Sequence, residues 1–335
     1  KYFLLGAFST GFFLYGIALV YGATGSVDIA QVATVALEGA AVAPLLLFGV
    51  AFLIIGFGFK VAAVPFHMWT PDVYEGAPAP ITAFMATGVK AAAFLAFLRV
   101  FMVAFDNLYE VWYPILWWVA AITMVVANLI ALVQPNVKRM LAYSSIAHAG
   151  YLLVALVAAN EMASSAMLFY LLVYTLMNIG AFGVVIAVAH QGEDRLQVED
   201  YGGLGWQQPM LGVLFTVFLL SLAGFPGTGG FMGKIFLLQG AVDSDLWTLA
   251  IILVLTTLFS YWYYLRVVWY MWMRDASSPD AHASVVASLP MRVALFVSVG
   301  LILYLGIFPG SLLTFAQASV ESVVQVGGVF ASLIP

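Results

Sequence analysis

The chain has 335 residues, of which 64% are apolar and 8% are charged, and its mean hydropathy is +1.06. A water-soluble domain carries roughly 25% charged residues, so no soluble fold could hide this much apolar surface. Cysteine is absent, which excludes disulfides and any metal or iron–sulfur site held by thiolates. The net charge of −5 is small and scattered, so we expect lipid and other membrane subunits as partners, and no nucleic acid.

A transmembrane helix needs about 20 largely apolar residues. Nine stretches of the sequence meet this requirement: 2–22, 41–71, 80–104, 113–133, 138–159, 164–189, 209–242, 247–272 and 290–308. They predict an all-α, polytopic transmembrane helix bundle. Residues 309–335 are broken by polar residues and paired glycines, which predicts a short surface or half-inserted helix. Because the sequence begins at Lys1 and enters an apolar run at once, we expect it to lack its natural start.

The basic residues predict how the chain is oriented, because Lys and Arg concentrate in short cytoplasmic loops. One set of connections is flanked by Lys1, Lys138, Arg139, Arg195, Arg274 and Arg292. No Lys or Arg occurs in the alternate connections, which are 23–40, 105–112, 160–163, 243–246 and the C-terminal segment. We therefore predict a multi-pass protein of the cell inner (plasma) membrane, with its N-terminus cytoplasmic and its C-terminus outside.

Three lysines lie inside apolar stretches, at Lys60, Lys90 and Lys234. A charge near the bilayer centre is costly, so it normally faces a bundle interior or a watery cavity and marks an ion or proton path. The alternative is a side chain that extends along a lipid-facing helix to the headgroups. That alternative stays open for Arg99 and Arg266, which lie nearer helix ends, whereas each of the three lysines lies beside helix-breaking sequence.

Two of the apolar stretches are too long for one straight span. The stretch 41–71 carries Lys60 and then Pro65, and the stretch 209–242 carries Lys234. Just before Lys234 come the breaking residues Pro226, Gly227, Gly229 and Gly230. Proline removes a backbone donor and glycine tolerates unusual dihedral angles, which predicts non-helical backbone within a few residues of both lysines. Interrupted helices indicate a transport site, so we predict two half-channels, each with one buried lysine.

A buried lysine suits proton transfer because burial disfavours its charged form, so that a neighbouring charge can decide whether it holds a proton. His148, in the segment YSSIAHAGY, adds a group that can relay a proton between its two ring nitrogens. Hydroxyls lie nearby in the sequence, at Tyr143, Ser144, Ser145 and Tyr151. A histidine that only packs and forms hydrogen bonds is the alternative for His148, and both interpretations stay open.

His67 is a second histidine with two interpretations. It precedes Asp72 and Glu75 near a predicted cytoplasmic end. A solvated loop residue is the interpretation we favour, and a proton entry site is the alternative.

Three segments carry a resemblance to a known family: FKVAAVPFHMWTPDVYEGAPAPITAFMATGVKAAAF, KRMLAYSSIAHAGYLLVAL and LSLAGFPGTGGFMGKIFLL. They resemble signatures of the antiporter-like membrane subunits of respiratory NADH:quinone oxidoreductase, complex I. The forms WTPDVYEGAPAP and GFMGK favour the N-type subunit over its L and M relatives. The resemblance extends over nearly the whole chain.

This resemblance implies a fourteen-helix antiporter-like fold with two inverted five-helix repeats, of which the nine spans look like the last nine helices. The fold would then be N-terminally incomplete. Residues 1–112 would hold three spans of the first repeat, 113–272 the five spans of the second repeat, and 273–335 a C-terminal span and tail.

The resemblance also implies roles for individual lysines. Lys60 matches the lysine of the first broken helix, Lys90 the connecting lysine of the next helix, and Lys234 the lysine of the second broken helix. Lys1 matches a lysine close to the start of a helix. The family pairs its first lysine with a membrane glutamate, and no acidic residue within a span of this sequence replaces it.

The function implied by the resemblance is that of a translocase subunit, in which protons move through half-channels by way of buried lysines. Quinone reduction elsewhere in complex I would drive the transport, and this chain would bind no flavin, iron–sulfur cluster, nicotinamide or metal. Its partners would be other membrane subunits of complex I. Two alternatives remain: an Mrp-type cation/proton antiporter subunit, and a non-pumping membrane scaffold.

Overall fold

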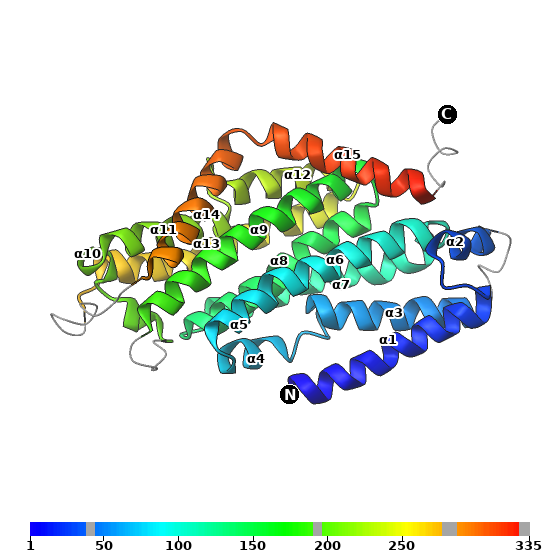
Figure 1. Cartoon of the computed structure of the whole chain (residues 1–335), viewed down its shortest axis with the longest axis horizontal. Helices are drawn as coiled ribbons and strands as arrows, with labels where there is room; N and C mark the ends of the chain where they lie inside the picture. Colours follow the sequence, from blue (N-terminus) through cyan, green and yellow to red (C-terminus); the bar gives the residue numbers. More distant parts are fainter. Residues whose placement is uncertain (38–43, 190–195, 277–286, 328–335) are drawn as a thin grey trace.

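The structure is a computed structural model that describes residues 1–37, 44–189, 196–276 and 287–327. These residues form an elongated bundle in which most helices run along the long axis (Figure 1). In the described residues, eight helices are long and apolar enough to cross a membrane. They are Tyr2–Thr24 (α1), Pro44–Val61 (α3), Ala79–Ala104, Asp106–Leu132, Val137–Ala158 (α8), Glu161–Val188 (α9), Trp247–Met273 (α13) and Leu289–Ile307 (α14). The predicted polytopic helix bundle is therefore confirmed.

The ninth apolar stretch is interrupted, as its prolines and glycines predict. Helix α11 (Pro209–Ala223) and helix α12 (Gly229–Asp243) have 15 residues each, which is too short for either to span a bilayer alone. Helix α11 ends at Gly224, which adopts the left-handed conformation with φ 86° and ψ 48°. The side chain of Thr228 caps the start of α12 by accepting a hydrogen bond from the Phe231 amide.

The first predicted interruption differs in form from the second. Helix α3 ends at Val61, a non-helical segment follows, and α4 (Thr70–Gly76) is only seven residues long. The stretch 41–71 is thus one span that ends close to Lys60, and its second part is too short to cross a membrane. The backbone in this break is satisfied from the bundle, since the amide of Val64 donates to the Thr123 hydroxyl at 2.9 Å.

Two π-helical turns widen the span between residues 79 and 104. Helix α5 (Ala79–Phe84) runs into η2 (Met85–Val89), and α6 (Lys90–Arg99) runs into η3 (Val100–Ala104). The span then leads through η4 (Asp106–Leu108) into α7 (Tyr109–Leu132). Such π turns are rare and often occur at functional sites. The η2 turn directly precedes Lys90.

Helix α8 forms the centre of the bundle. It packs against α4, α7, α9 and α12, and 20 of its 22 residues are buried. Apart from Lys138, Arg139 and His148, its sequence consists of apolar, small and hydroxyl-bearing residues, which is typical of a helix surrounded by other helices. Helix α8 is therefore the element best placed to present polar groups to several neighbours at once.

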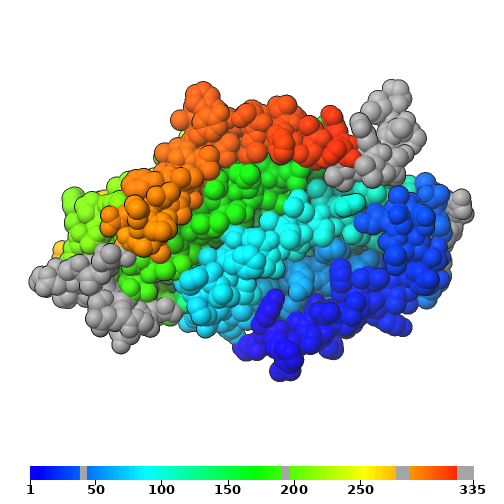
Figure 2. All heavy atoms as spheres, viewed as in Figure 1, coloured from blue at the N-terminus to red at the C-terminus, as the bar shows by residue number. Residues whose placement is uncertain are grey.

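The short elements lie at the two ends of the bundle and along one side. Helix α2 (Ile29–Leu37) lies at one end, and α4 and α10 (Leu204–Gln207) lie at the other, where η5 (Val198–Tyr201) also packs against α13 (Figure 1). Helix α15 (Gly310–Gly327) follows α14 and lies along α9, as the red and green surfaces in Figure 2 show. It is not among the eight candidate spans of the described residues, in agreement with the prediction for the tail.

Candidate functional site

Two of the three predicted lysines are buried in the bundle. The exposed fraction is 2% for Lys90, at the start of α6, and 5% for Lys234, in α12. Lysine is almost never buried to this extent without polar partners. The two side chains therefore require an account of what holds their ammonium groups.

Lys90 is held by the central helix. Its Nζ atom donates to the carbonyl oxygen of Ser145 at 2.7 Å and to the Oγ atom of the same residue at 2.5 Å. The Tyr174 hydroxyl on α9 donates to this Oγ atom at 2.9 Å. A single serine of α8 thus joins an amine of α6 to a phenol of α9.

His148 lies on α8 one turn after Ser145 and is 1% exposed. Its Nδ1 atom is 2.6 Å from the Tyr170 hydroxyl, and its Nε2 atom is 3.2 Å from the Tyr264 hydroxyl. A neutral imidazole has one donor and one acceptor nitrogen, and a hydroxyl can complement either. The Tyr264 hydroxyl also forms a hydrogen bond with Ser144. Both ring nitrogens of His148 are therefore connected to groups with exchangeable protons.

Lys234 is held by the break between α11 and α12. Its Nζ atom donates to the carbonyl oxygens of Leu222 at 3.1 Å and Ala223 at 2.9 Å. These carbonyls belong to the last turn of α11, where backbone acceptors lack helical partners and the helix dipole is negative. The Nζ atom also lies 5.0 Å from the ring centroid of Tyr151, a distance suited to a cation–π contact.

The spacing along two helices explains how these groups meet. Residues three or four positions apart share a helix face, which brings Ser145, His148 and Tyr151 to one side of α8. Tyr170 and Tyr174 share a face of α9 for the same reason. We call the resulting arrangement the buried polar row, and it consists of Lys90, Ser144, Ser145, His148, Tyr151, Tyr170, Tyr174, Lys234 and Tyr264.

Sequence reasoning did not find the three tyrosines that surround His148, namely Tyr170, Tyr174 and Tyr264. A signal for two of them exists in the sequence, because Tyr170, Tyr174 and Asn178 recur every four residues within an apolar span. Tyr264 has no such signal, since the approach of α13 to α8 is a tertiary contact. Tyr143, one of the hydroxyls predicted from the sequence, is only partly buried.

Lys60 does not occupy the buried position that the sequence predicts. Its side chain is exposed in the described residues, so its predicted place in the bundle interior is wrong for this part of the chain. Lys60 lies in the last turn of α3, and the helices that pack against α3, which are α1, α6 and α7, leave its face of that helix open. The structure therefore does not bring Lys60 into the buried polar row.

The two arginines for which two interpretations remained open differ from each other. Arg99 is exposed, in agreement with a side chain that extends to the membrane surface. Arg266 is half-buried and donates to the carbonyl oxygen of Leu132 at 3.1 Å and to that of Gln134. It therefore caps the C-terminal end of α7, where a cation is favourable.

The basic pair at residues 138 and 139 lies in the first turn of α8 and not in an open loop. Lys138 is fully buried and donates to the carbonyl oxygens of Glu75 at 3.2 Å and Ala77 at 3.0 Å. Lys138 flanks the connection between α7 and α8, as predicted, and α4 and its C-terminal end cover it there. Asn136 caps α8 by accepting from the Arg139 amide at 3.1 Å.

A cluster of ion pairs fastens α4 to the same end of α8. Arg139 contacts the carboxylates of Asp72 at 2.8 Å and Glu75 at 2.7 Å, and Lys1 also pairs with Asp72. Hydrogen bonds from Lys1 and then Arg139 hold the pKa of Asp72 below its usual value. His67, in the preceding break, is half-buried. These carboxylates connect α4 to α8 and do not contact Lys90 or Lys234.

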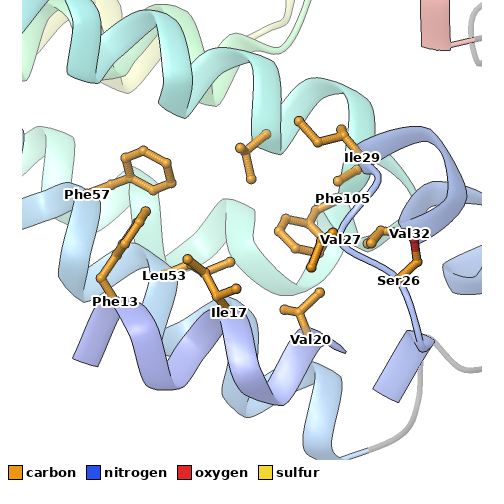
Figure 3. Close-up of a pocket in the computed structure, with 12 residues that line it drawn as sticks. Phe13, Ile17, Val20, Ser26, Val27, Ile29, Val32, Leu53, Phe57 and Phe105 are labelled. Atoms are coloured by element: carbon orange, nitrogen blue, oxygen red, sulfur yellow. The ribbon is translucent and has the colours of Figure 1, made fainter. Parts of the chain in front are cut away.

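An apolar pocket of about 310 Å³ lies away from the buried polar row, between α1, α2, α3 and η3 (Figure 3). Phe13, Leu53, Phe57 and Phe105 line it, and Ser26 supplies a polar atom. No titratable side chain lines this pocket, so it offers no proton chemistry. Among the described residues, no three His, Asp or Glu side chains gather closely enough to hold a metal ion.

An all-helical membrane bundle with a broken helix and buried, bonded amines is an arrangement typical of ion-translocating membrane proteins. Residues 1–260 match the family described as "NADH:quinone oxidoreductase/Mrp antiporter, TM". The chain belongs to this family. The residues matched include Lys90, His148 and Lys234.

The similar curated proteins carry the N-type description that the sequence motifs favoured. NADH-quinone oxidoreductase subunit N of Trichlorobacter lovleyi is 51% identical over 322 residues, which cover 96% of this chain and 66% of that protein. NADH-quinone oxidoreductase subunit N 1 of Sorangium cellulosum is 48% identical over 96% of this chain and 65% of its own length. The predicted resemblance is confirmed, and the chain spans slightly less than two thirds of the length of these relatives.

Two solved structures with the same fold come from different kinds of complex. A chain of respiratory complex I from Thermus thermophilus with bound Aureothin has a TM-score of 0.80 and 41% identity, over 94% of this chain and 67% of that one. A chain of the Mrp complex from Dietzia sp. DQ12-45-1b has a TM-score of 0.84 and 21% identity, over 96% of this chain and 67% of that one. The second likeness concerns the fold alone. Both support the predicted antiporter-like fold.

Proposed function

We propose that this chain is a proton-translocating membrane subunit of an NADH:quinone oxidoreductase, and that Lys90, His148 and Lys234 carry the protons. The observation that carries this proposal is the buried polar row, in which Lys90 and His148 are bonded to hydroxyls and Lys234 to backbone carbonyls inside an apolar bundle. Such groups are expensive to bury, and transfer of protons is the use that explains all of them together.

Each member of the row can pass a proton by ordinary acid–base chemistry. Lys90 can pass a proton to the Ser145 hydroxyl, its acceptor at 2.5 Å, as that hydroxyl gives its own proton to the Tyr174 oxygen 2.9 Å away. Hydroxyls both donate and accept, and His148 can take a proton on one nitrogen and release the other. In the low dielectric of the bundle, a charge on one amine disfavours a charge on the next. A charge that arrives at one end would therefore drive a proton onward along the row.

The direction of transport in this proposal follows from the predicted orientation. With the N-terminus cytoplasmic, α12 runs toward the outer side, and Lys234 is the last buried carrier before that side. In an accessibility assay, a tag within residues 190–208 should then be cytoplasmic and a tag at the C-terminus should be outside. Tags on the same side would show that the orientation, and with it the assigned direction, is wrong.

In this proposal the driving force comes from outside this chain. We propose that other membrane subunits of complex I deliver it as a change of charge or conformation at the ends of the row. Lys60 takes part as a carrier only where a neighbouring segment or subunit supplies polar groups to its exposed side chain. The division of the chain into repeats at residues 112 and 272 belongs to the same proposal.

An Mrp-type cation/proton antiporter is the second candidate, and the fold is compatible with it. Sequence identity favours the oxidoreductase, since the relatives described as its subunit N share 45–51% identity with the chain, against 21% for the Mrp chain. Transport that depends on sodium in vesicles containing the full-length protein would support the antiporter. A non-pumping scaffold predicts that loss of the buried lysines leaves pumping unchanged.

Substitution of Lys234 tests the proposal in sealed vesicles that contain the assembled complex. Lys234→Met keeps the apolar stem and removes the titratable amine, so assembly should survive and proton pumping should fall. Lys234→Arg keeps a positive charge but cannot release a proton, so it should also fail to pump. Arg99→Met is the matched control, because Arg99 is an exposed cation within a membrane span and is not a member of the row.

Each outcome of this test has a distinct meaning. Normal pumping by Lys234→Arg would replace the carrier role with an electrostatic role. Normal pumping by Lys234→Met as well would remove both roles and favour the scaffold.

A further inference from the structure

The end of helix α11 is shaped by a glycine that the sequence motifs do not single out. Gly224 has φ 86° and ψ 48°, a left-handed conformation that turns the chain out of the helix. The turn leaves the carbonyl oxygens of Leu222 and Ala223 without helical partners, and Lys234 donates to both. The geometry of residue 224 therefore decides where the acceptors for the Lys234 ammonium lie.

Gly224 also borders the lysine side chain directly. A Cβ atom on residue 224 would lie 3.0 Å from the Cδ atom of Lys234, 3.3 Å from Nζ and 3.4 Å from Cε. The first two distances are tighter than ordinary van der Waals contact, so a Cβ atom at this position would require the Lys234 side chain to shift by a few tenths of an ångström.

We propose that Gly224 is a positioning residue for Lys234, because its missing side chain lets the ammonium group rest against the carbonyls at the end of α11. We call these carbonyls, of residues 222 and 223, the lysine seat. The inference deepens the proposed function and rests on Lys234 being a proton carrier. The inference adds that residue 224 must lack a side chain, which does not follow from the charge of Lys234 alone.

A third carbonyl at the break supports this assignment. The oxygen of Gly224 itself accepts a hydrogen bond from the Tyr261 hydroxyl of α13 at 2.9 Å. Three consecutive carbonyls, of residues 222 to 224, are thus each bonded to a side chain from another helix. Tyr261 fixes the peptide after the seat, so the acceptors of Lys234 are held in place from two sides.

Gly227 provides a matched comparison within the same break. It has the same φ of 86°, and no atom of the described residues lies within 4 Å of the position its Cβ atom would take. Alanine at either glycine would carry the same kind of backbone strain. The fold accepts alanine at positive φ elsewhere, at Ala62 with 63° and Ala159 with 50°. The two glycines therefore share a φ of 86° and differ in their contact with Lys234.

A displaced ammonium group would lose stabilisation of its charged form. The titratable groups that surround Lys234 are His148 and Tyr151 on α8, Tyr170 on α9, and Tyr261 on α13. All are neutral groups or weak acids, so none supplies a negative charge in place of the seat. The charged form of Lys234 would then be less favoured than in the parent protein.

The experiment compares Gly224→Ala with Gly227→Ala in the full-length protein within its membrane complex, each with Lys234 and with Lys234→Ala. Thermal unfolding gives two double-mutant cycles. Gly224→Ala should lower the Tm more than Gly227→Ala does. When Lys234 is replaced by alanine, the two glycine substitutions should lower the Tm by the same amount. Should Gly224→Ala fail to assemble, the double variant should restore assembly to the level of Gly227→Ala.

The pH dependence of proton pumping is the second measurement. The alkaline limb of the profile should move to lower pH in Gly224→Ala and stay in place in Gly227→Ala. Equal Tm losses with additive cycles, or identical pH profiles for the two variants, would overturn the inference. Normal pumping by Lys234→Met would instead overturn the carrier role, and the thermal cycles would still test the lysine seat.

Discussion

Ser145→Ala is the substitution that most directly tests how the bundle holds a buried amine. The Ser145 hydroxyl accepts from Lys90 at 2.5 Å and from Tyr174 at 2.9 Å, while the Ser145 carbonyl accepts from Lys90 at 2.7 Å. Alanine removes the hydroxyl and keeps the carbonyl. Lys90 would retain one of its two bonds, and Tyr174 would lose its acceptor.

The size of the effect depends on these two lost bonds. A hydrogen bond to a charged group contributes roughly 1.5–3 kcal/mol, and a buried donor without a partner costs about 1–3 kcal/mol. The first loss weakens the protonated form of Lys90, which moves the alkaline limb of the pumping profile to lower pH by about one to two units. The second loss should appear as lower stability of the assembled subunit, because the Tyr174 hydroxyl stays buried at 1% exposure.

Ser165→Ala is the matched control, because Ser165 is also fully buried but donates only to the Glu161 carbonyl of its own helix at 2.8 Å. Both variants should be measured by thermal unfolding of the complex and by proton pumping in sealed vesicles across a pH series. Ser145→Ala should lose stability and shift the profile, and Ser165→Ala should do neither to a comparable degree. If the two variants behave alike, the Ser145 hydroxyl does not hold Lys90 and the link from α6 to α8 is wrong.

Two further predictions concern packing and pH. Gly230→Ala should block assembly, because its Cβ atom would overlap the backbone oxygen of Ser221 on α11, whereas Gly300→Ala, with no described atom within 4 Å, should leave yield of the complex unchanged or raised. The bonds from Lys1 and Arg139 to Asp72 lower the pKa of that carboxyl, so their stabilisation is complete above about pH 4 and is lost as pH falls through the folded value. Infrared titration of Asp72 should show protonation at higher pH in Arg139→Gln, and an unchanged titration would contradict the assigned cause.

The two predicted helix breaks show how far local sequence determines this fold. Between 224 and 228, proline, glycine and a threonine cap all favour the same outcome, and α11 and α12 end and begin where these residues predict. Around Pro65, the sequence indicates a break but not the length of the next helix. Helix α4 is only seven residues long because it must reach the start of α8, and that contact lies 60 or more residues away in sequence.

The candidate site was predictable where a side chain costs so much free energy to place in an apolar span that it indicates a function. A charge or an imidazole in an apolar run is such a case, and Lys90, His148 and Lys234 are all buried. Tyrosines are common in membrane spans and carry no comparable penalty, so their contacts with His148 depend on how α9 and α13 pack around α8. Lys60 shows that an apolar stretch alone does not predict burial. A lysine is buried only where another segment packs over it, and none of the described residues does so at Lys60.

The partners of the two buried amines explain why such groups can remain exchangeable. Within the described residues, Lys90 and Lys234 donate to carbonyl and hydroxyl oxygens, whereas Lys1 and Arg139 pair with carboxylates at the end of the bundle. A buried ammonium paired with a carboxylate is held strongly, and removing one partner costs about 3–5 kcal/mol. Neutral dipoles stabilise the charge less, so a neighbouring charge can expel the proton. The helix break therefore has a role in the proposed transfer, because its neutral carbonyls stabilise the protonated form of Lys234 and still allow the proton to leave.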